Sequence, residues 1–137
     1  MRTPRKSGQE PFGPDWLRGT LSRLLPGFPE VAVCVALSGG VDSTALLAAL
    51  ARMSAEGMRL RAVHVDHGLH PNAKRWSAHC RRLARQLGVP LKVLTVKVAR
   101  ERGASLEEAA RVARYRSLAA QLRGGEALLT AHTRDDQ

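Results

Sequence analysis

The residues with the clearest chemical potential form the hexapeptide SGGVDS, residues 38 to 43. The apolar run Val31 to Val35 precedes it and predicts a buried strand, and Thr44 to Leu47 follow with the composition of a helix start. Asp42 or Ser43 is expected to cap that helix. A strand, a glycine turn and a helix N-terminus bring together free backbone N–H groups and the positive end of a helix dipole. The hexapeptide therefore predicts a site for an anion such as phosphate.

The hexapeptide, which we call the SGGVDS loop, matches neither of two common phosphate-binding motifs. It lacks the lysine of the Walker motif and the G-x-G-x-x-G spacing of dinucleotide-binding folds. It resembles the pyrophosphate-binding loop of the PP-loop ATPases, which split ATP between the α- and β-phosphates and activate a substrate as its adenylate. The resemblance implies that Ser38, Ser43 and the amides of Gly39 and Gly40 hold pyrophosphate and that Asp42 holds or steers Mg²⁺. An ordinary strand–turn–helix connection uses the same residue types and stays open as the alternative.

Two further polar segments follow predicted strands. Residues 64 to 70, HVDHGLH, hold three histidines and one aspartate. A metal site is one interpretation, but no second cluster of the same type accompanies it, which favours histidines that pack or line a nucleotide pocket. Residues 132 to 137, HTRDDQ, include Asp135 and Asp136. Such paired acids can hold Mg²⁺ through one member while the other orients a base or an amine, and they can also cap a helix.

Arginines in two predicted helices complete the candidate set. Arg111 and Arg114 lie three residues apart and share a helix face, so together they can neutralise phosphate charge. A solvated basic face is the alternative. The predicted helix Ala73 to Leu87 has basic residues over much of its surface. Its apolar stripe consists of Trp76, Cys80, Leu83 and Leu87.

The remaining pattern predicts strands that alternate with helices. The strands are expected at 31–37, 60–65, 91–98 and 127–131, and the helices at about 43–55, 73–87 and 106–122. Gly88 is expected to end the second of these helices, and Ser105 precedes the third. A shorter helix capped by Asp15 is expected to cover one edge of the core, after a disordered tail at Met1 to Pro14.

This order predicts an α/β fold with a doubly wound, mostly parallel sheet, strand order about 3-2-1-4, and helices on both faces. Ligands of such sheets bind beyond the carboxyl ends of the strands, where the strand order reverses. The SGGVDS loop, the histidine segment and the acidic segment all follow such strand ends. We therefore expect them to form one site.

Composition limits the class of protein and its partners. The 137 residues, 44% of them hydrophobic, suit one globular domain. The net charge of +10 indicates a polyanionic partner, with nucleic acid first and an anionic membrane surface second. When the charge is considered by itself, however, a protein that is simply basic and has no such partner is a slightly better explanation. Cys34 and Cys80 form no C-x-x-C pair and are expected to be buried in a reducing compartment. With no membrane-spanning run and no secretory signal, we expect a cytoplasmic protein.

Four motifs together resemble one PP-loop family, the tRNA(Ile)-lysidine synthetases, over about Val31 to Gln137. The first is the SGGVDS loop, which all PP-loop enzymes share, and the second is VDHGL at 65–69. The third lies in EEAARVARYRSL and matches the family's A-R-x-x-R-Y-x-x-L at Ala110 to Leu118. The fourth, AHTRDDQ, matches its A-H-x-x-D-D-Q at Ala131 to Gln137. Their order and spacing are much more specific than the first motif alone.

The resemblance implies an adenine-nucleotide α-hydrolase-like fold, with an extension at 1–30 and a PP-loop ATP-binding domain at 31–137. It also implies that ATP adenylates the C2 oxygen of the wobble cytidine of tRNA(Ile) with a CAU anticodon, and that the amine of L-lysine then attacks C2 and displaces AMP. The basic helix at 73–87 is, by the same resemblance, a candidate tRNA-facing surface. The oligomeric state is left open, a homodimer included. The residues implied are Ser38, Gly39, Gly40, Val41, Asp42 and Ser43 for the ATP phosphates, Asp42 with Asp135 or Asp136 for Mg²⁺ and the reacting centre, Arg111 and Arg114 for ATP or the adenylate, and His132 for the pocket wall.

The sequence departs from this family in one main respect. It ends at Gln137, inside the last motif, whereas the family continues with A-E-T and further domains, so we expect a truncated chain. His70, where the family often has arginine, is a minor departure. Two alternatives remain: another PP-loop enzyme, such as a tRNA thiolase or an amidotransferase synthetase domain, and an ATP-binding fragment without catalysis. The missing C-x-x-C pairs argue against a cytidine thiolase.

Overall fold

A computed structural model of the chain describes residues 13–28, 30–54, 57–66, 68, 71–97 and 105–131. Several of the segments discussed above lie outside these ranges. They are most of the N-terminal tail, His67 and His70 of the histidine segment, and the whole of 132–137 with His132, Asp135 and Asp136.

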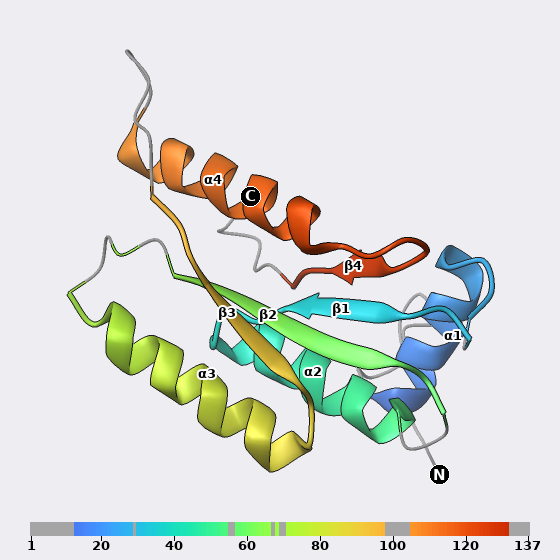
Figure 1. The fold of residues 1–137 in the computed structure, drawn as a ribbon. Helices are drawn as coiled ribbons and strands as arrows, with labels where there is room; N and C mark the ends of the chain where they lie inside the picture. Colours follow the sequence, from blue (N-terminus) through green and yellow to red (C-terminus); the bar gives the residue numbers. More distant parts are fainter. Residues whose placement is uncertain are drawn as a thin grey trace, which may run out of the picture.

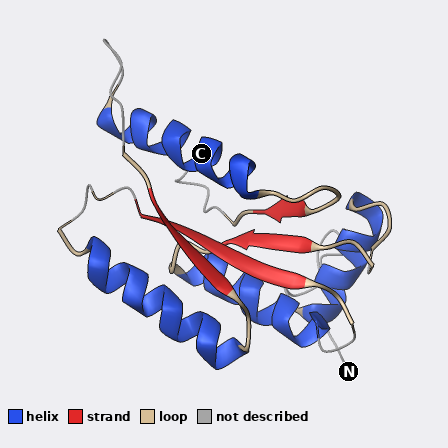
Figure 2. Ribbon diagram, in the orientation of Figure 1, coloured by secondary structure: helices blue, strands red, loops and turns tan. Residues whose placement is uncertain are grey.

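The described chain forms four strands and four helices in alternating order (Figures 1 and 2). All strand pairs are parallel, and the sheet order is β3-β2-β1-β4, as predicted. None of the helices in the described part of the chain is long and apolar enough to cross a membrane. The elements are α1 (Pro14–Leu24), β1 (Val33–Ala36), α2 (Val41–Ser54), β2 (Leu60–Asp66), α3 (Ala73–Leu87), β3 (Leu91–Thr95), α4 (Leu106–Gln121) and β4 (Ala127–Leu129).

The central strand β1 feeds side chains into two hydrophobic clusters, one on each face of the sheet. Val33 and Val35 pack with α1, α2 and α3, whereas Cys34 and Ala36 pack with Leu118 of α4. Figure 1 shows the same division, with α4 over one face and α2 and α3 over the other. The predicted doubly wound architecture is therefore confirmed, and both free cysteines are buried as expected.

The predicted starts of two helices were wrong. α2 begins at Val41, before either predicted cap, because the Gly40 carbonyl accepts the first helical bond from the Thr44 N–H at 3.0 Å. α1 begins at Pro14 after Gly13, and Asp15 lies in its first turn instead of capping it. Proline suits this first position, since its fixed φ is helical and the missing N–H has no partner to lose.

The boundaries of α3 and α4 agree closely with the sequence. α3 has the predicted bounds and ends at Gly88, whose φ of 70° is left-handed. The Ser105 side chain caps α4 and accepts a hydrogen bond from the Glu108 N–H at 3.1 Å. Local turn chemistry fixes both ends, which is why one sequence is enough to find them.

An ion pair that the sequence did not suggest joins β2 to the turn before β4. Arg61 donates from Nε to Glu126 Oε2 at 2.7 Å and from Nη2 to Glu126 Oε1 at 2.6 Å. The side chains are only 13% and 4% exposed. The hydrogen bond from Arg61 lowers the pKa of Glu126 more than burial raises it. This pair joins the turn before β4 to β2 and so holds β4 in the sheet.

Replacing Glu126 with glutamine is expected to lower the free energy of unfolding by about 2–3 kcal/mol at neutral pH, because Arg61 loses its charged partner. Since the folded-state pKa of Glu126 is lowered, the wild-type contribution is present above the ordinary glutamate pKa and is lost as the pH falls below about 4. Urea unfolding at pH 7 and pH 3.5 measures both effects. The exposed Glu30→Gln is the matched control, and an equal loss in both variants would contradict the prediction.

Candidate functional site

The SGGVDS loop follows β1 at the point where the strand order reverses, as predicted. Two serine hydroxyl groups close it from within: Ser38 Oγ and Ser43 Oγ lie 2.9 Å apart, and Ser43 Oγ accepts from the Ser38 N–H at 3.1 Å. Ser38 Oγ also accepts from the Gly40 N–H at 3.3 Å. Ser43 is 1% exposed. These bonds hold the turn in one shape at the N-terminus of α2.

Gly39 is the residue of this turn that tolerates no side chain. Its φ is 89°, in the left-handed region that favours glycine. A Cβ atom at Gly39 would lie 3.0 Å from Cys80 Sγ and 3.0 Å from Trp76 Nε1. At Gly40, by contrast, a Cβ would meet only Ser38 Oγ, at an ordinary 3.5 Å. The turn therefore lies directly against α3.

Trp76 is a site residue that sequence reasoning missed. It was assigned to the apolar stripe of α3, but its side chain is 47% exposed and its Nε1–H donates to the Ser38 carbonyl. The predicted apolar stripe is confirmed at Cys80, which is fully buried. A tryptophan usually finds a hydrogen-bond partner for its indole N–H, and this preference was the one signal in the sequence that could have indicated a contact with the loop. The first turn of α3 thus supports the SGGVDS loop.

A pocket of about 190 Å³ opens beside the loop at the carboxyl ends of β1 and β2. Four of its lining residues are polar or amphipathic: Ser38 from the loop, His64 from β2, Trp76 from α3 and Arg114 from α4. The remaining lining residues are Ala36, Leu37, Val63, Val65 and Leu118. The structure thus brings Ser38, His64 and Arg114 together from three separate predicted segments.

The two predicted arginines of α4 differ in placement. Arg114 lines the pocket and is partly buried, with its guanidinium carbon 5.7 Å from the centre of the Tyr115 ring. Arg111 is exposed and is not among the residues that line the pocket. The spacing of three residues predicted one shared helix face, but only Arg114 of the two lines the pocket.

His64 and Cys80 pack behind the loop in uncharged forms. His64 Nδ1 lies 2.8 Å from the Leu37 carbonyl and 3.5 Å from Cys80 Sγ. Burial lowers the pKa of His64, so the neutral ring donates its Nδ1–H to Leu37 near pH 7. Burial also raises the pKa of Cys80 to about 11, which keeps the thiol protonated. In the described residues no group of three or more histidine, cysteine or acidic side chains gathers to hold a metal ion.

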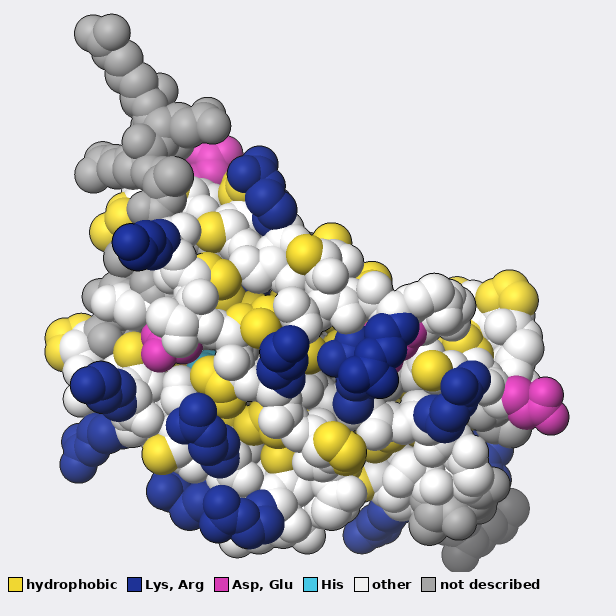
Figure 3. Space-filling view, viewed as in Figure 1, with side chains coloured by type: hydrophobic (Ala, Val, Ile, Leu, Met, Phe, Trp, Pro, Cys, Tyr) yellow, Lys and Arg dark blue, Asp and Glu magenta, His cyan; other side chains and the backbone are white. Residues whose placement is uncertain are grey.

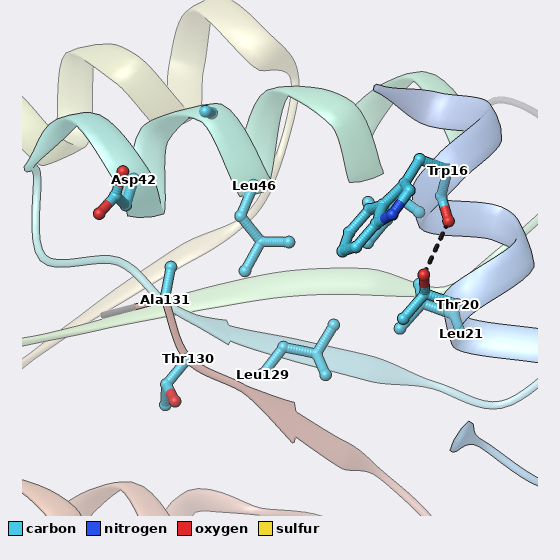
Figure 4. A pocket seen from close by; sticks show the side chains of 10 residues that line it. Trp16, Thr20, Leu21, Asp42, Leu46, Leu129, Thr130 and Ala131 are labelled. Carbon is cyan, nitrogen blue, oxygen red and sulfur yellow. Dashed lines mark hydrogen bonds between the residues drawn. The ribbon is translucent and has the colours of Figure 1, made fainter. Parts of the chain in front are cut away.

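Asp42 lines a second cavity, of about 350 Å³, between α1, α2 and the end of β4. Figure 4 shows Asp42 and Leu46 of α2 facing Leu129 and Ala131, with Trp16 of α1 at the far side. The walls are mostly aliphatic, and Asp42 supplies a carboxylate that is exposed to solvent. The SGGVDS loop therefore contributes Ser38 to one cavity and Asp42 to the other.

Comparison with known proteins agrees with the fold described above. The sequence profile of the PP-loop domain matches residues 17–137, which include every described strand. The chain belongs to the PP-loop domain family. The SGGVDS loop lies within the matched residues.

Two relatives show which PP-loop enzymes the chain is similar to. The PP-loop domain is 56% identical over 110 residues to a tRNA(Ile)-lysidine synthase of Alkalilimnicola ehrlichii, covering 80% of this chain and 25% of that protein. It is 52% identical over 119 residues to the tRNA(Ile)-lysidine synthase of Pseudomonas aeruginosa, covering 85% of this chain and 26% of the relative. The resemblance inferred from four motifs is thus confirmed. The chain spans about a quarter of the length of these relatives.

Proposed function

We propose that this PP-loop domain binds and cleaves ATP in a tRNA(Ile)-lysidine synthase reaction. In that reaction the C2 oxygen of the wobble cytidine of tRNA(Ile) with a CAU anticodon attacks the α-phosphate of ATP and is adenylated, and pyrophosphate leaves. The amine of L-lysine then attacks C2, AMP leaves, and a carbon–nitrogen bond remains. The observation that carries the proposal is the SGGVDS loop at the N-terminus of α2, in a chain about half identical to named lysidine synthases. With ATP and tRNA as substrates, we expect the reaction to take place in the cytoplasm.

The loop has the features that a pyrophosphate group requires. The positive φ of Gly39 allows the tight turn, the N-terminus of α2 supplies a positive dipole end, and two hydroxyl groups stand beside the turn. We assign the ATP phosphates to residues 38–43. The adjacent pocket, lined by His64 and Trp76, then receives the nucleoside part of ATP.

Arg114 is the cation best placed to balance charge on ATP or the adenylate, because it lines that pocket. A guanidinium stays charged at all working pH values and can bind two phosphate oxygens at once. Arg111 is assigned to the same substrate from the family motif, and its exposed position suits contact with a ligand larger than the pocket. His132 is assigned to the pocket wall on the same basis.

Asp42 fits a magnesium site, because its carboxylate is an exposed oxygen donor in the first turn of α2. With Asp135 or Asp136, it would hold Mg²⁺, which neutralises phosphate charge when bound. The cavity beside Asp42 has mostly aliphatic walls, which suit the methylene chain of L-lysine.

The proposal is tested by incubating the protein with ATP, Mg²⁺, labelled lysine and a tRNA(Ile) transcript with a CAU anticodon. We expect label in the RNA and release of AMP and pyrophosphate. A transcript with uridine at the wobble position is the control and should take up no label. ATP binding with neither pyrophosphate release nor lysine incorporation would instead support a nucleotide-binding module without catalysis, and pyrophosphate release without incorporation of lysine into the RNA would support another PP-loop enzyme.

Replacing Trp76 with phenylalanine is expected to weaken ATP binding about fivefold. Phenylalanine keeps an aromatic ring at this position, but the Ser38 carbonyl loses its donor, and one such hydrogen bond is worth about 1 kcal/mol. Calorimetric titration with ATP measures the change, and thermal unfolding checks that the fold is retained. An ATP affinity equal to that of the wild type would show that the indole N–H does not fix the loop.

A further inference from the structure

The exposed side of α3 is strongly basic. Its five lysines and arginines are all exposed, and its 15 residues include no acid. The positive character extends into β3, because residues 67 to 97 contain no aspartate or glutamate, and Lys92 of β3 is exposed as well. The five residues are Lys74, Arg75, Arg81, Arg82 and Arg85.

Helical geometry sorts these side chains into two adjacent rows. Lys74, Arg81 and Arg85 are spaced 7 and 4 residues apart, so they align along a row about 16 Å long. Arg75 and Arg82 form the neighbouring row. Figure 3, in the orientation of Figure 1, shows dark blue side chains gathered at the lower left, where α3 lies. We call these five residues the α3 basic surface.

This surface begins at the candidate site. The Trp76 indole in the first turn of α3 bonds to the Ser38 carbonyl of the SGGVDS loop. Burial is the main cause of the lowered pKa of His64, and the positive charges of Arg114 and Arg81 lower it further. Arg81 is therefore close enough to act on a side chain that lines the pocket.

We propose that the α3 basic surface binds the phosphate backbone of the RNA substrate and leads it to the pocket. This inference rests on the proposed function. Rows of arginines without acidic neighbours are suited to phosphates and provide sequence-independent affinity. A membrane surface fits less well, because a membrane-binding helix needs a free apolar face, whereas Ser77, Cys80 and Ala84 of α3 are buried against the sheet.

The test compares two triple variants with the same net charge. Arg81, Arg82 and Arg85 are changed to glutamine in one variant, and the exposed Arg23, Arg52 and Arg116, from α1, α2 and α4, in the other. Each lowers the net charge from +10 to +7. Binding of a fluorescent tRNA(Ile) transcript is measured by anisotropy at several salt concentrations, and ATP binding by calorimetry. Vesicles that contain phosphatidylserine serve as the competing anionic surface.

We expect the α3 variant to bind tRNA at least about tenfold more weakly, with a salt dependence reduced by about two counterions. The control variant should change much less, and both should bind ATP like the wild type. Equal weakening in the two variants, no tRNA binding by the wild type at low salt, or a preference for vesicles over RNA would overturn the proposal. Because ATP binding is measured separately, these outcomes are distinguishable from failure of the SGGVDS loop assignment.

Discussion

Replacing Asp42 with asparagine is expected to reduce pyrophosphate release at least about 100-fold, which is the largest effect that we predict for a single side chain. Asparagine has nearly the same shape but would not balance the charge of the Mg²⁺ that we propose at the ATP phosphates. The side chain is exposed and lies in the first turn of α2, so its replacement should leave the packing of the core unchanged.

The measurement is pyrophosphate release with ATP, tRNA(Ile) and lysine over a range of Mg²⁺ concentrations. Glu107→Gln is a matched control, because it also removes an exposed carboxylate from the first turn of a helix, α4. Thermal unfolding should be the same for both variants and the wild type. A rate for Asp42→Asn equal to that of the control would remove Asp42 from the proposed reaction.

Replacing Gly39 with alanine is expected to weaken ATP binding about 10- to 100-fold and to lower the free energy of unfolding by about 2–3 kcal/mol. The positive φ contributes a backbone penalty, and the new methyl group would press against Cys80 Sγ and the Trp76 ring. Cys80 is fully buried and cannot move aside. The loop must shift instead, and it would carry the Ser38 and Ser43 hydroxyl groups away from their present positions.

Two other glycines separate the causes of this effect. Gly125 has a φ of 76°, but a Cβ added there would meet no atom within 4 Å, so Gly125→Ala reports the backbone penalty alone. Gly40→Ala places a methyl group in the same loop at an ordinary contact distance. Calorimetric ATP titration and urea unfolding should rank Gly39→Ala as the most damaging change. If Gly40→Ala lowered ATP affinity as much, contact with α3 would not be the reason.

The elements of this fold follow from local sequence patterns. Apolar runs and helical periodicity predicted every strand and helix of the described residues. Gly88 and Ser105 marked two helix ends, because these ends depend on the left-handed φ of Gly88 and on the side-chain hydroxyl of Ser105. The strand order also followed, because short right-handed crossovers leave few arrangements for such a chain. The strand order in turn places the SGGVDS loop, which follows β1, at the point where that order reverses.

Tertiary structure alone decided which side chains meet around that loop. Trp76 reaches Ser38 across 38 residues, and Arg61 reaches Glu126 across 65 residues. Arg114 lines the pocket whereas Arg111, on the same predicted face, does not. Periodicity gives the direction of a side chain about its own helix axis, but the distance to another element depends on how the two pack. The sequence by itself therefore determined where the loop lies, and packing of α3 and α4 on the sheet determined what surrounds it.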